Sequence, residues 1–266
     1  MDKTSKPGRL DRREVLAAGA AIAAAPAARA APPEHFSPIV ELRQYTLRGG
    51  RRDELIALFE AQFIESQEAV GAHILGLFRD LDDPDRFVWL RGFPSMDARA
   101  AALKAFYFGP VWKAHRSAAN ATILDSDNVL LLHPARPGGG FATPAPRQGA
   151  GEVLAFVHYL DDALTQPFTD FFEAHIRPQA QADGAQVLAS FASETSPNSF
   201  PQLPVREKDR VCIWFARTSL GQGARFLDQW RKRTGWRDAA GDALLPAFMR
   251  KPEVLRLHPT ARSPLA

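Results

Sequence analysis

The chain has 266 residues, of which 45% are hydrophobic and 24% charged, a composition typical of a globular protein with a sizeable core. Its formal charge of +3 arises in residues 1–30, which hold six of the 33 basic and three of the 30 acidic groups, so the rest is neutral. A neutral body argues against a nucleic-acid or anionic-membrane partner, because such binding needs Lys and Arg to neutralise phosphates. Cys212 is the only cysteine, so no intramolecular disulfide can form, and its apolar surroundings predict a buried, unreactive thiol.

The N-terminal residues have the features of an export signal. Arg12 and Arg13 precede an alanine-rich run of low charge, and Ala28-Arg29-Ala30 offers the small residues that a signal peptidase cleaves after. The two adjacent arginines resemble a twin-arginine signal, and the run is too short and alanine-rich for a stable membrane span. We therefore predict a signal peptide over residues 1–30 and a periplasmic or secreted mature chain; an exposed N-terminal helix is the alternative.

The first half of the mature chain is predicted to fold as strand, helix, strand, strand, helix, strand. Apolar and other residues alternate from Ile39 to Leu47, which indicates a strand with two different faces. Ser95 or Asp97 can cap the second helix, and Gly109-Pro110 must break or kink it. The elements are expected at 39–47, 50–70, 74–79, 87–93, 98–117 and 129–133.

The same order of elements recurs after a Pro/Gly-rich stretch. The pattern of residues 87–95 echoes in 211–219, and that of 129–134 echoes in 254–259. We predict a first domain at 31–134, a linker at 135–151, a divergent second domain at 152–259 and a tail at 260–266. The second set of elements is expected at 153–160, 168–182, 186–193, 211–217, 222–248 and 254–258, with breaks near Gly235 and Gly241.

Each half therefore reads as a ferredoxin-like βαββαβ unit, whose sheet carries helices on one face only. Two such units can bury both open faces by packing sheet to sheet. The predicted fold class is α+β, with tandem ferredoxin-like repeats forming an intrachain dimeric α+β barrel.

Several motifs of the first half resemble one known family. The Glu41-x-Arg43-x-Tyr45 strand, Trp89-x-x-Gly92-Phe93 and Ser95-x-x-x-Arg99 are similar to the NIPSNAP family of the dimeric α+β barrel superfamily. The resemblance covers 39–133 most specifically and is weak over 152–258, where the first pattern becomes Leu154-x-Phe156-x-His158. It implies the barrel fold; related barrel families include small monooxygenases and haem-degrading enzymes.

The side chains that would line a cavity between the sheets follow from the strand parity. If helices cover Val40 and Leu42, the residues that alternate with them point into the space between the sheets. Glu41 can then form an ion pair in that space with Arg43 or Arg91. An apolar wall with few polar groups is typical of a small-molecule site. The predicted ligand-binding residues are Glu41, Arg43, Tyr45, Trp89, Arg91, Phe156 and His158; the alternative is an internal ion-pair network that docks the sheets.

No local metal-binding signature occurs among the seven histidines, so no metal is predicted. The candidate catalytic residues are His158, Arg43 and Tyr45, for proton abstraction or substrate polarisation. No cofactor is required by the sequence, although His158 could ligate haem.

Three functions are compatible with these residues. The first is an exported NIPSNAP-like protein that binds a small apolar or amphipathic molecule between the sheets. The second is a monooxygenase-like or haem-dependent enzyme that uses the same cavity, and the third is a structural or homo-oligomer-forming module with a filled interior.

Overall fold

The computed structural model describes Met1 and residues 37–141, 151–233 and 235–265. The predicted signal peptide at residues 1–30 lies outside these described residues apart from Met1, as does most of the predicted linker. Backbone contacts group Pro33–Ala266 into one compact unit. Among the described residues, no helix combines the length and the apolar character needed to cross a bilayer.

Eight antiparallel strands close into a barrel. Their order around the barrel is β1-β3-β2-β8-β5-β7-β6-β4. The strands are β1 (Ile39–Leu47), β2 (His73–Asp80), β3 (Arg86–Phe93), β4 (Ile123–Pro134), β5 (Gly151–Tyr159), β6 (Gln186–Ser193), β7 (Val211–Ser219) and β8 (Glu253–Pro259).

The barrel consists of two equivalent four-stranded sheets. The first half contributes β4-β1-β3-β2 and the second contributes β8-β5-β7-β6, which is one strand order repeated. Short pairings close the barrel where the halves meet, with Arg79 opposite His258 and His133 opposite Ala192. The tandem ferredoxin-like prediction is therefore confirmed.

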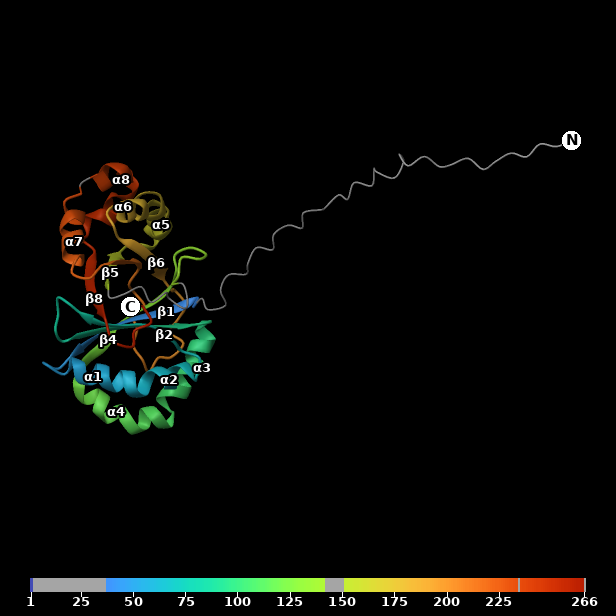
Figure 1. Ribbon diagram of the computed structural model, residues 1–266, viewed down its shortest axis with the longest axis vertical. Helices are drawn as coiled ribbons and strands as arrows, with labels where there is room; N and C mark the ends of the chain where they lie inside the picture. The colour runs from blue at the N-terminus through green and yellow to red at the C-terminus, as the bar shows by residue number, and fades with distance from the viewer. Residues whose placement is uncertain (2–36, 142–150, 234, 266) are drawn as a thin grey trace. The chain divides into compact units, whose positions relative to one another are not determined.

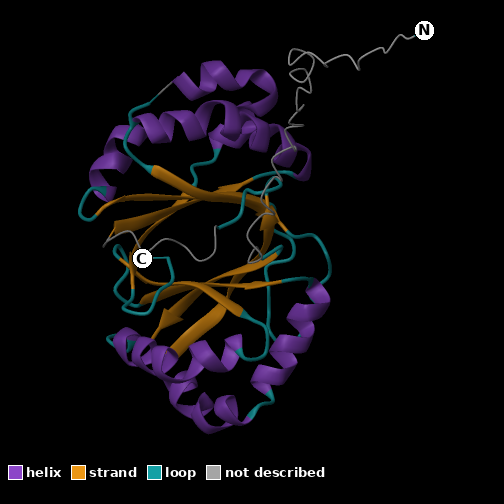
Figure 2. Ribbon diagram, turned by 45° about the vertical axis from the view of Figure 1, so that its right-hand side comes forward, coloured by secondary structure: helices purple, strands orange, loops and turns teal. Residues whose placement is uncertain are grey.

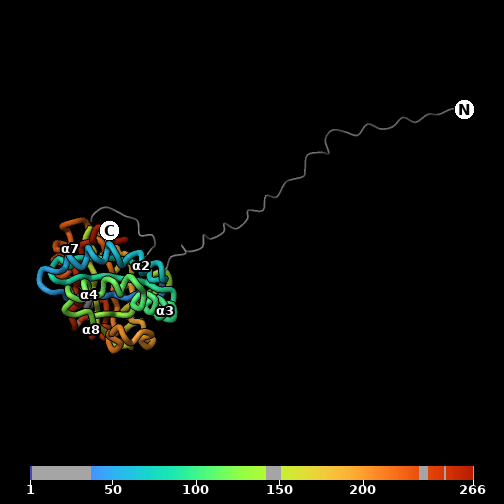
Figure 3. The backbone as a smooth tube through the Cα atoms, turned by 90° about the horizontal axis from the view of Figure 1, so that it is seen from below, coloured from blue at the N-terminus to red at the C-terminus, as the bar shows by residue number. Residues whose placement is uncertain are grey.

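Each sheet carries its own helices on the outer face of the barrel (Figures 1 and 2). Figure 3, turned by 90°, shows α2, α3 and α4 in front of the strands of the first half. The first half has α1 (Arg52–Leu58), η1 (Phe59–Phe63), α2 (Ile64–Glu68), α3 (Met96–Tyr107) and α4 (Pro110–Thr122). The second has η2 (Asp162–Leu164), α5 (Thr165–Phe171), η3 (Phe172–Ile176), α6 (Arg177–Ala182), α7 (Gly223–Arg231) and α8 (Gly235–Met249).

Local chemistry explains where several of these helices begin and break. The Ser95 hydroxyl accepts a hydrogen bond from the backbone N–H of Ala98 at 3.1 Å and caps α3, as expected. Pro110 lacks a backbone N–H and so begins α4 instead of continuing α3. Gly241 interrupts α8 with φ of 63°, a left-handed conformation that glycine adopts without steric cost.

Apolar side chains from all eight strands fill the interior of the barrel. The predicted cavity between the sheets is instead a packed core, because both inner faces are apolar and meet. Phe141 and Leu265, which follow the last strand of each half, belong to the same core. The strand residues of this core are Val40, Leu42, Leu75, Phe78, Val88, Leu90, Leu130, Leu132, Val153, Ala155, Val157, Ala189, Phe191, Val211, Ile213, Phe215, Leu255 and Leu257.

The strand registers show which residues are equivalent in the two halves. Arg43 lies opposite Trp89, and Phe156 lies opposite Trp214, so these two pairs correspond. The predicted alignment of 87–95 with 211–219 is therefore wrong by one residue. A shift of one residue exchanges the two faces of a strand. The strand register, and not the similarity of the two sequences, therefore decides which residues are equivalent.

Candidate functional site

The predicted direction of the polar row on β1 is wrong. Val40 and Leu42 belong to the barrel core, so Glu41, Arg43 and Tyr45 point outward to the helices of their own half. Trp89 and Arg91 on β3 share this outward face, as do Leu154, Phe156 and His158 on β5. Alternation identifies two faces of a strand, but it does not say which face looks inward.

Three arginines converge on one buried carboxylate in the first half. Arg43 Nη1 and Arg91 Nε donate to Glu41 Oε2 at 2.9 and 2.7 Å, and Arg99 Nε donates to Oε1 at 2.6 Å. All four side chains are fully buried. Arg91 Nη1 also donates to Gln67 Oε1 at 2.8 Å, so α2 and α3 each supply a partner to the sheet. The predicted pairing of Glu41 with Arg43 or Arg91 is confirmed for both; Arg99 is an additional member.

The electrostatics of this cluster keep Glu41 ionised. Burial alone would raise the pKa of Glu41, but Arg91, Arg43 and Arg99 lower it well below its usual value. Arg43 Nε donates to the Tyr45 hydroxyl at 3.1 Å, and burial raises the pKa of that phenol. The cluster is therefore a fixed set of charges at neutral pH.

Aromatic side chains fill the space between the first sheet and its helices. Trp89 packs against Tyr45 and Phe59, with ring centroids 5.8 and 4.8 Å apart. A hollow of only about 30 Å³ remains there. Its lining residues are Tyr45, Leu55, Phe59, Phe63, Gln67, Trp89, Phe106, Tyr107, Trp112, Ala119 and Ile123.

A loop from the second half closes this cluster. Arg99 Nη1 donates to Asn198 Oδ1 and Ser199 Oγ at 3.0 and 3.1 Å. Phe200 stacks on Tyr107 with ring centroids 6.0 Å apart. The long loop between β6 and β7 therefore covers part of the first half.

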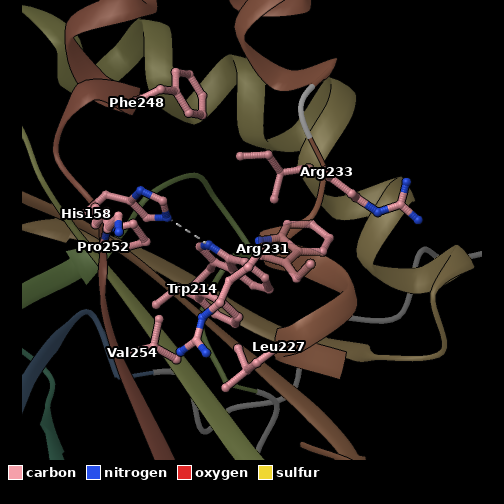
Figure 4. Close-up of a pocket in the computed structure, with 12 residues that line it drawn as sticks. His158, Trp214, Leu227, Arg231, Arg233, Phe248, Pro252 and Val254 are labelled. Atoms are coloured by element: carbon pink, nitrogen blue, oxygen red, sulfur yellow. Dashed lines mark hydrogen bonds between the residues drawn. The ribbon is translucent and has the colours of Figure 1, made fainter. Parts of the chain in front are cut away.

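The second half has an open pocket at the corresponding place. The pocket has a volume of about 720 Å³ and lies between the second sheet and the helices η3, α7 and α8 (Figure 4). Phe156 and Trp214 form its floor, stacked in parallel with ring centroids 3.9 Å apart. Aromatic and aliphatic side chains form most of the wall: Ile176, Leu227, Trp230, Phe248, Pro252 and Val254.

His158 lies in the wall of this pocket as a neutral imidazole. Burial lowers the pKa of His158 to about 3. Its Nε2 accepts a hydrogen bond from Trp214 Nε1 at 3.2 Å, and because an indole can only donate, the ring proton resides on Nδ1. In Figure 4 this second ring nitrogen lies on the side of Phe248, away from Trp214. His158 can therefore offer a hydrogen-bond donor to a bound molecule.

Basic side chains stand at the mouth of the pocket. Arg231, Arg233 and Lys251 line it together with the aromatic wall. Arg233 Nε donates to Asp183 Oδ2 at 2.8 Å, whereas Arg231 and Lys251 are exposed and form no ion pair within the described part of the chain. The mouth therefore favours an anionic group on whatever enters.

The structure separates the predicted site residues into two groups. Phe156 and His158 line the large pocket, whereas Glu41, Arg43, Tyr45, Trp89 and Arg91 lie in or beside the buried cluster of the other half. The three candidate catalytic residues are therefore split between two layers on opposite sides of the barrel. No group of three or more metal-ligating side chains occurs among the described residues.

Sequence reasoning missed most of the pocket. Trp214 was not among the predicted site residues, and the residues from α7 and α8 lie far away in the chain. The consecutive Arg231-Lys232-Arg233 was an available signal for a basic mouth. Cys212 is buried, and burial raises its thiol pKa to about 11, which agrees with the predicted unreactive role.

Comparison with known proteins finds a family that the first half resembles. Residues 40–136 match the NIPSNAP family model, so the first half is similar to NIPSNAP domains. A NIPSNAP family protein from Agrobacterium tumefaciens is 27% identical over 36% of this chain and 91% of that chain, with a TM-score of 0.34. A search of curated proteins gives no match.

Two solved structures share the whole two-half architecture. A "putative monooxygenase" from Fusobacterium nucleatum is 10% identical, covers 85% of this chain and 93% of that chain, and has a TM-score of 0.51. An anthrone oxidase-like protein is 12% identical over 86% of this chain and 96% of that chain, with a TM-score of 0.50. At these identities the similarity establishes the fold.

Proposed function

We propose that this chain binds a small aromatic molecule carrying a negative charge in the helix-side pocket of its second half. The observation that carries the proposal is a 720 Å³ pocket with a stacked aromatic floor and a basic mouth. That volume is within the range of sites for small organic ligands, which are usually apolar with a few polar groups for orientation.

The pocket residues have complementary roles in this proposal. Phe156 and Trp214 offer a flat apolar surface on which an aromatic ring can stack. Arg231 and Lys251 attract a carboxylate, sulfonate or phenolate at the mouth, and the Nδ1–H of His158 donates to a ligand oxygen. The ligand is therefore amphipathic, as the sequence suggested, but its site is beside a helix layer and not between the sheets.

A pair of fluorescent probes tests this proposal. The anionic probe 8-anilinonaphthalene-1-sulfonate should bind, and replacing Arg231 and Lys251 by Gln together should weaken it by roughly fivefold or more. The neutral probe N-phenyl-1-naphthylamine has the same ring system, so its affinity should change little in that variant.

A pocket-filling variant locates the probe. Leu227 and Val254 lie next to Trp214 (Figure 4), so Leu227→Trp with Val254→Trp should abolish binding of both probes. Leu220→Trp, at an exposed position outside the pocket, is the matched control and should bind as the parent does. Unchanged probe binding in the double tryptophan variant would show that the pocket is not the site.

The second candidate function is an oxygenase reaction on a ligand in the same pocket. It is favoured by the neutral, buried His158 in the pocket wall and by the fold shared with the two solved proteins. His158 would have to release Trp214 before Nε2 could take up a proton. With anthrone as substrate, the parent chain should consume oxygen faster than His158→Phe. Equal oxygen uptake by the two proteins would remove this candidate.

We do not extend the proposal to haem. An axial histidine needs an unprotonated nitrogen, and in His158 Nε2 is engaged by Trp214 while Nδ1 carries the proton. The residues of the pocket therefore do not fit haem ligation in this arrangement.

We also propose export by the twin-arginine route. The support is the Arg12-Arg13 pair before the alanine-rich run and the Ala28-Arg29-Ala30 cleavage pattern. Residues 1–36 fused to a folded fluorescent reporter should deliver it to the periplasm of a bacterium. Replacing Arg12 and Arg13 by Lys should retain the reporter in the cytoplasm; periplasmic reporter in that variant would contradict the route.

A further inference from the structure

The buried cluster of the first half contains more positive than negative charge. Among the described residues, Glu41 is the one carboxylate that Arg43, Arg91 or Arg99 contacts. Each guanidinium keeps its proton in a protein, so one negative and three positive charges leave a net charge of +2 at full burial. Buried charges are costly unless they are paired.

Neighbouring polar groups do not neutralise this excess. Gln67 is an amide, and Asn198 and Ser199 offer only neutral oxygens to Arg99. Tyr45 remains a phenol at neutral pH, because burial raises its pKa above its ordinary value. The faces of Trp89 and Tyr45 lie 5.5 and 5.4 Å from the Arg43 Cζ atom, which lowers the cost of the charge but does not cancel it.

The cluster also contains donors that lack an acceptor. Arg43 Nη2, Arg99 Nη2 and Trp89 Nε1 are buried and have no hydrogen-bond partner in the described part of the chain. Leaving a buried donor unsatisfied destabilises the folded state, and more so when the donor is charged. Charge and hydrogen-bonding capacity therefore point to the same missing partner, an anion.

We propose that the Arg43–Arg91–Arg99 cluster binds one small inorganic or formate-sized monoanion, such as chloride. A neighbouring hollow indicates how little space this layer leaves. Tyr45, Trp89 and Tyr107 line the hollow, and guanidinium groups of the cluster lie over these rings, but none of the three arginines lines the hollow itself. Its volume of about 30 Å³ corresponds to roughly two or three water-sized spheres, which excludes phosphate esters and aromatic acids.

This site is separate from the aromatic pocket of the second half. The equivalents of Glu41 and Arg43 there are Leu154 and Phe156, which carry no charge. The anion would be a permanent structural ligand of the first half. It would lie beneath the loop that carries Asn198 and Ser199. The inference therefore does not rest on the proposed ligand of the second half.

Crystallography with bromide tests the site directly. Crystals of the whole chain grown in sodium bromide should show an anomalous peak within hydrogen-bonding distance of Arg43 Nη2 or Arg99 Nη2. A map with peaks elsewhere and none in the cluster would overturn the proposal.

Thermal unfolding supplies an independent readout. At equal ionic strength, the Tm of the parent should rise by roughly 5 °C when chloride at about 100 times its Kd replaces gluconate, which is too large for the hollow. Arg43→Met should lose this dependence, because it removes one excess charge. Arg177→Met, which alters an ion pair of the second half, should keep the dependence.

The two readouts together leave the proposal falsifiable even if Arg43→Met does not fold. Equal Tm values of the parent in chloride and gluconate would contradict it. A chloride effect of the same size in Arg43→Met would also contradict it, because it would then come from another part of the surface.

Discussion

The two halves of the barrel share one strand order but differ on their helix-facing sides. In the first half, Glu41 and its three arginines and a set of aromatic rings leave about 30 Å³ unfilled. In the second half, Leu154 and Phe156 occupy the equivalent positions and a pocket of about 720 Å³ opens above them. One half is therefore densely packed beneath its helices, whereas the other half keeps an open pocket.

The comparison extends to the helices. Both halves contain a π-helical segment after the first strand, at Phe59–Phe63 and Phe172–Ile176. Phe63 fills the first half together with Trp112, whereas its counterpart Ile176 lines the open pocket. Side-chain volume at this position therefore contributes to the difference between the halves.

The largest effect that we expect tests the charge cluster. Glu41→Gln leaves three buried guanidinium groups without a carboxylate and should cost about 4 kcal/mol of unfolding free energy. Arg43→Met leaves Glu41 paired with two arginines and should cost less than about 2 kcal/mol. Urea unfolding followed by circular dichroism at pH 7 measures both. A smaller loss for Glu41→Gln than for Arg43→Met would show that charge does not control the stability of this half.

The second prediction uses low pH to distinguish the contributions of the two halves to stability. The folded pKa of His158, about 3, lies below its unfolded value, so its contribution to stability is lost as pH falls through 6.5 towards 3. This group alone should cost about 2 kcal/mol between pH 6.5 and pH 5. The lowered pKa of Glu41 acts in the same direction, but only below about pH 4.5.

A single substitution isolates the histidine contribution. In His158→Phe, the unfolding free energy should fall much less between pH 6.5 and pH 5, although the variant loses the acceptor of Trp214 at every pH. An unchanged slope would mean that His158 titrates normally and is not buried as a neutral ring.

The third prediction compares added volume in the two halves. Ala119→Leu inserts methyl groups beside the filled hollow of the first half and should cost roughly 1–2 kcal/mol by overpacking. Leu227→Trp adds volume at the open pocket and should change the unfolding free energy by less than about 1 kcal/mol. Equal costs in urea unfolding would indicate that the second pocket is closed in solution.

The smallest effect concerns Cys212. The thiol lies beneath the helices of the second half, and burial raises its pKa to about 11, so little thiolate forms at neutral pH. A disulfide reagent such as 5,5′-dithiobis(2-nitrobenzoate) should not label the native chain within minutes but should label it at once in urea. Fast labelling of the native chain would mean that the second half opens far more readily than its packing indicates.

Element order was predictable because it depends on local patterns. The alternation of Ile39–Leu47, the Gly109-Pro110 break and the Ser95 cap each act within a few residues of their own position. The repeat of strands and helices then indicated two equivalent units. The π-helical segments and the exact ends of the helices left no such signal.

The site could be predicted only in part. Glu41 and Arg43 share one face of β1 because they are two residues apart, and strand parity placed Arg91 of β3 on the same face of the sheet, where both arginines pair with Glu41. Arg99 joins them from a helix and Asn198 from the other half of the chain, about 100 residues away, so no local pattern reveals their contact. The same holds for Trp230 and Phe248, which approach Phe156 and Trp214 only after the helices pack.

The amino-acid sequence by itself determined the element order, the internal repeat and the existence of two contrasting faces on each strand, because these depend on periodicity and on local steric rules. Only the tertiary structure decided which face lies inside the barrel, since inward and outward parity satisfy the alternation equally well. It also decided which half is filled and which is open, because that depends on the summed volumes of side chains that meet from distant segments.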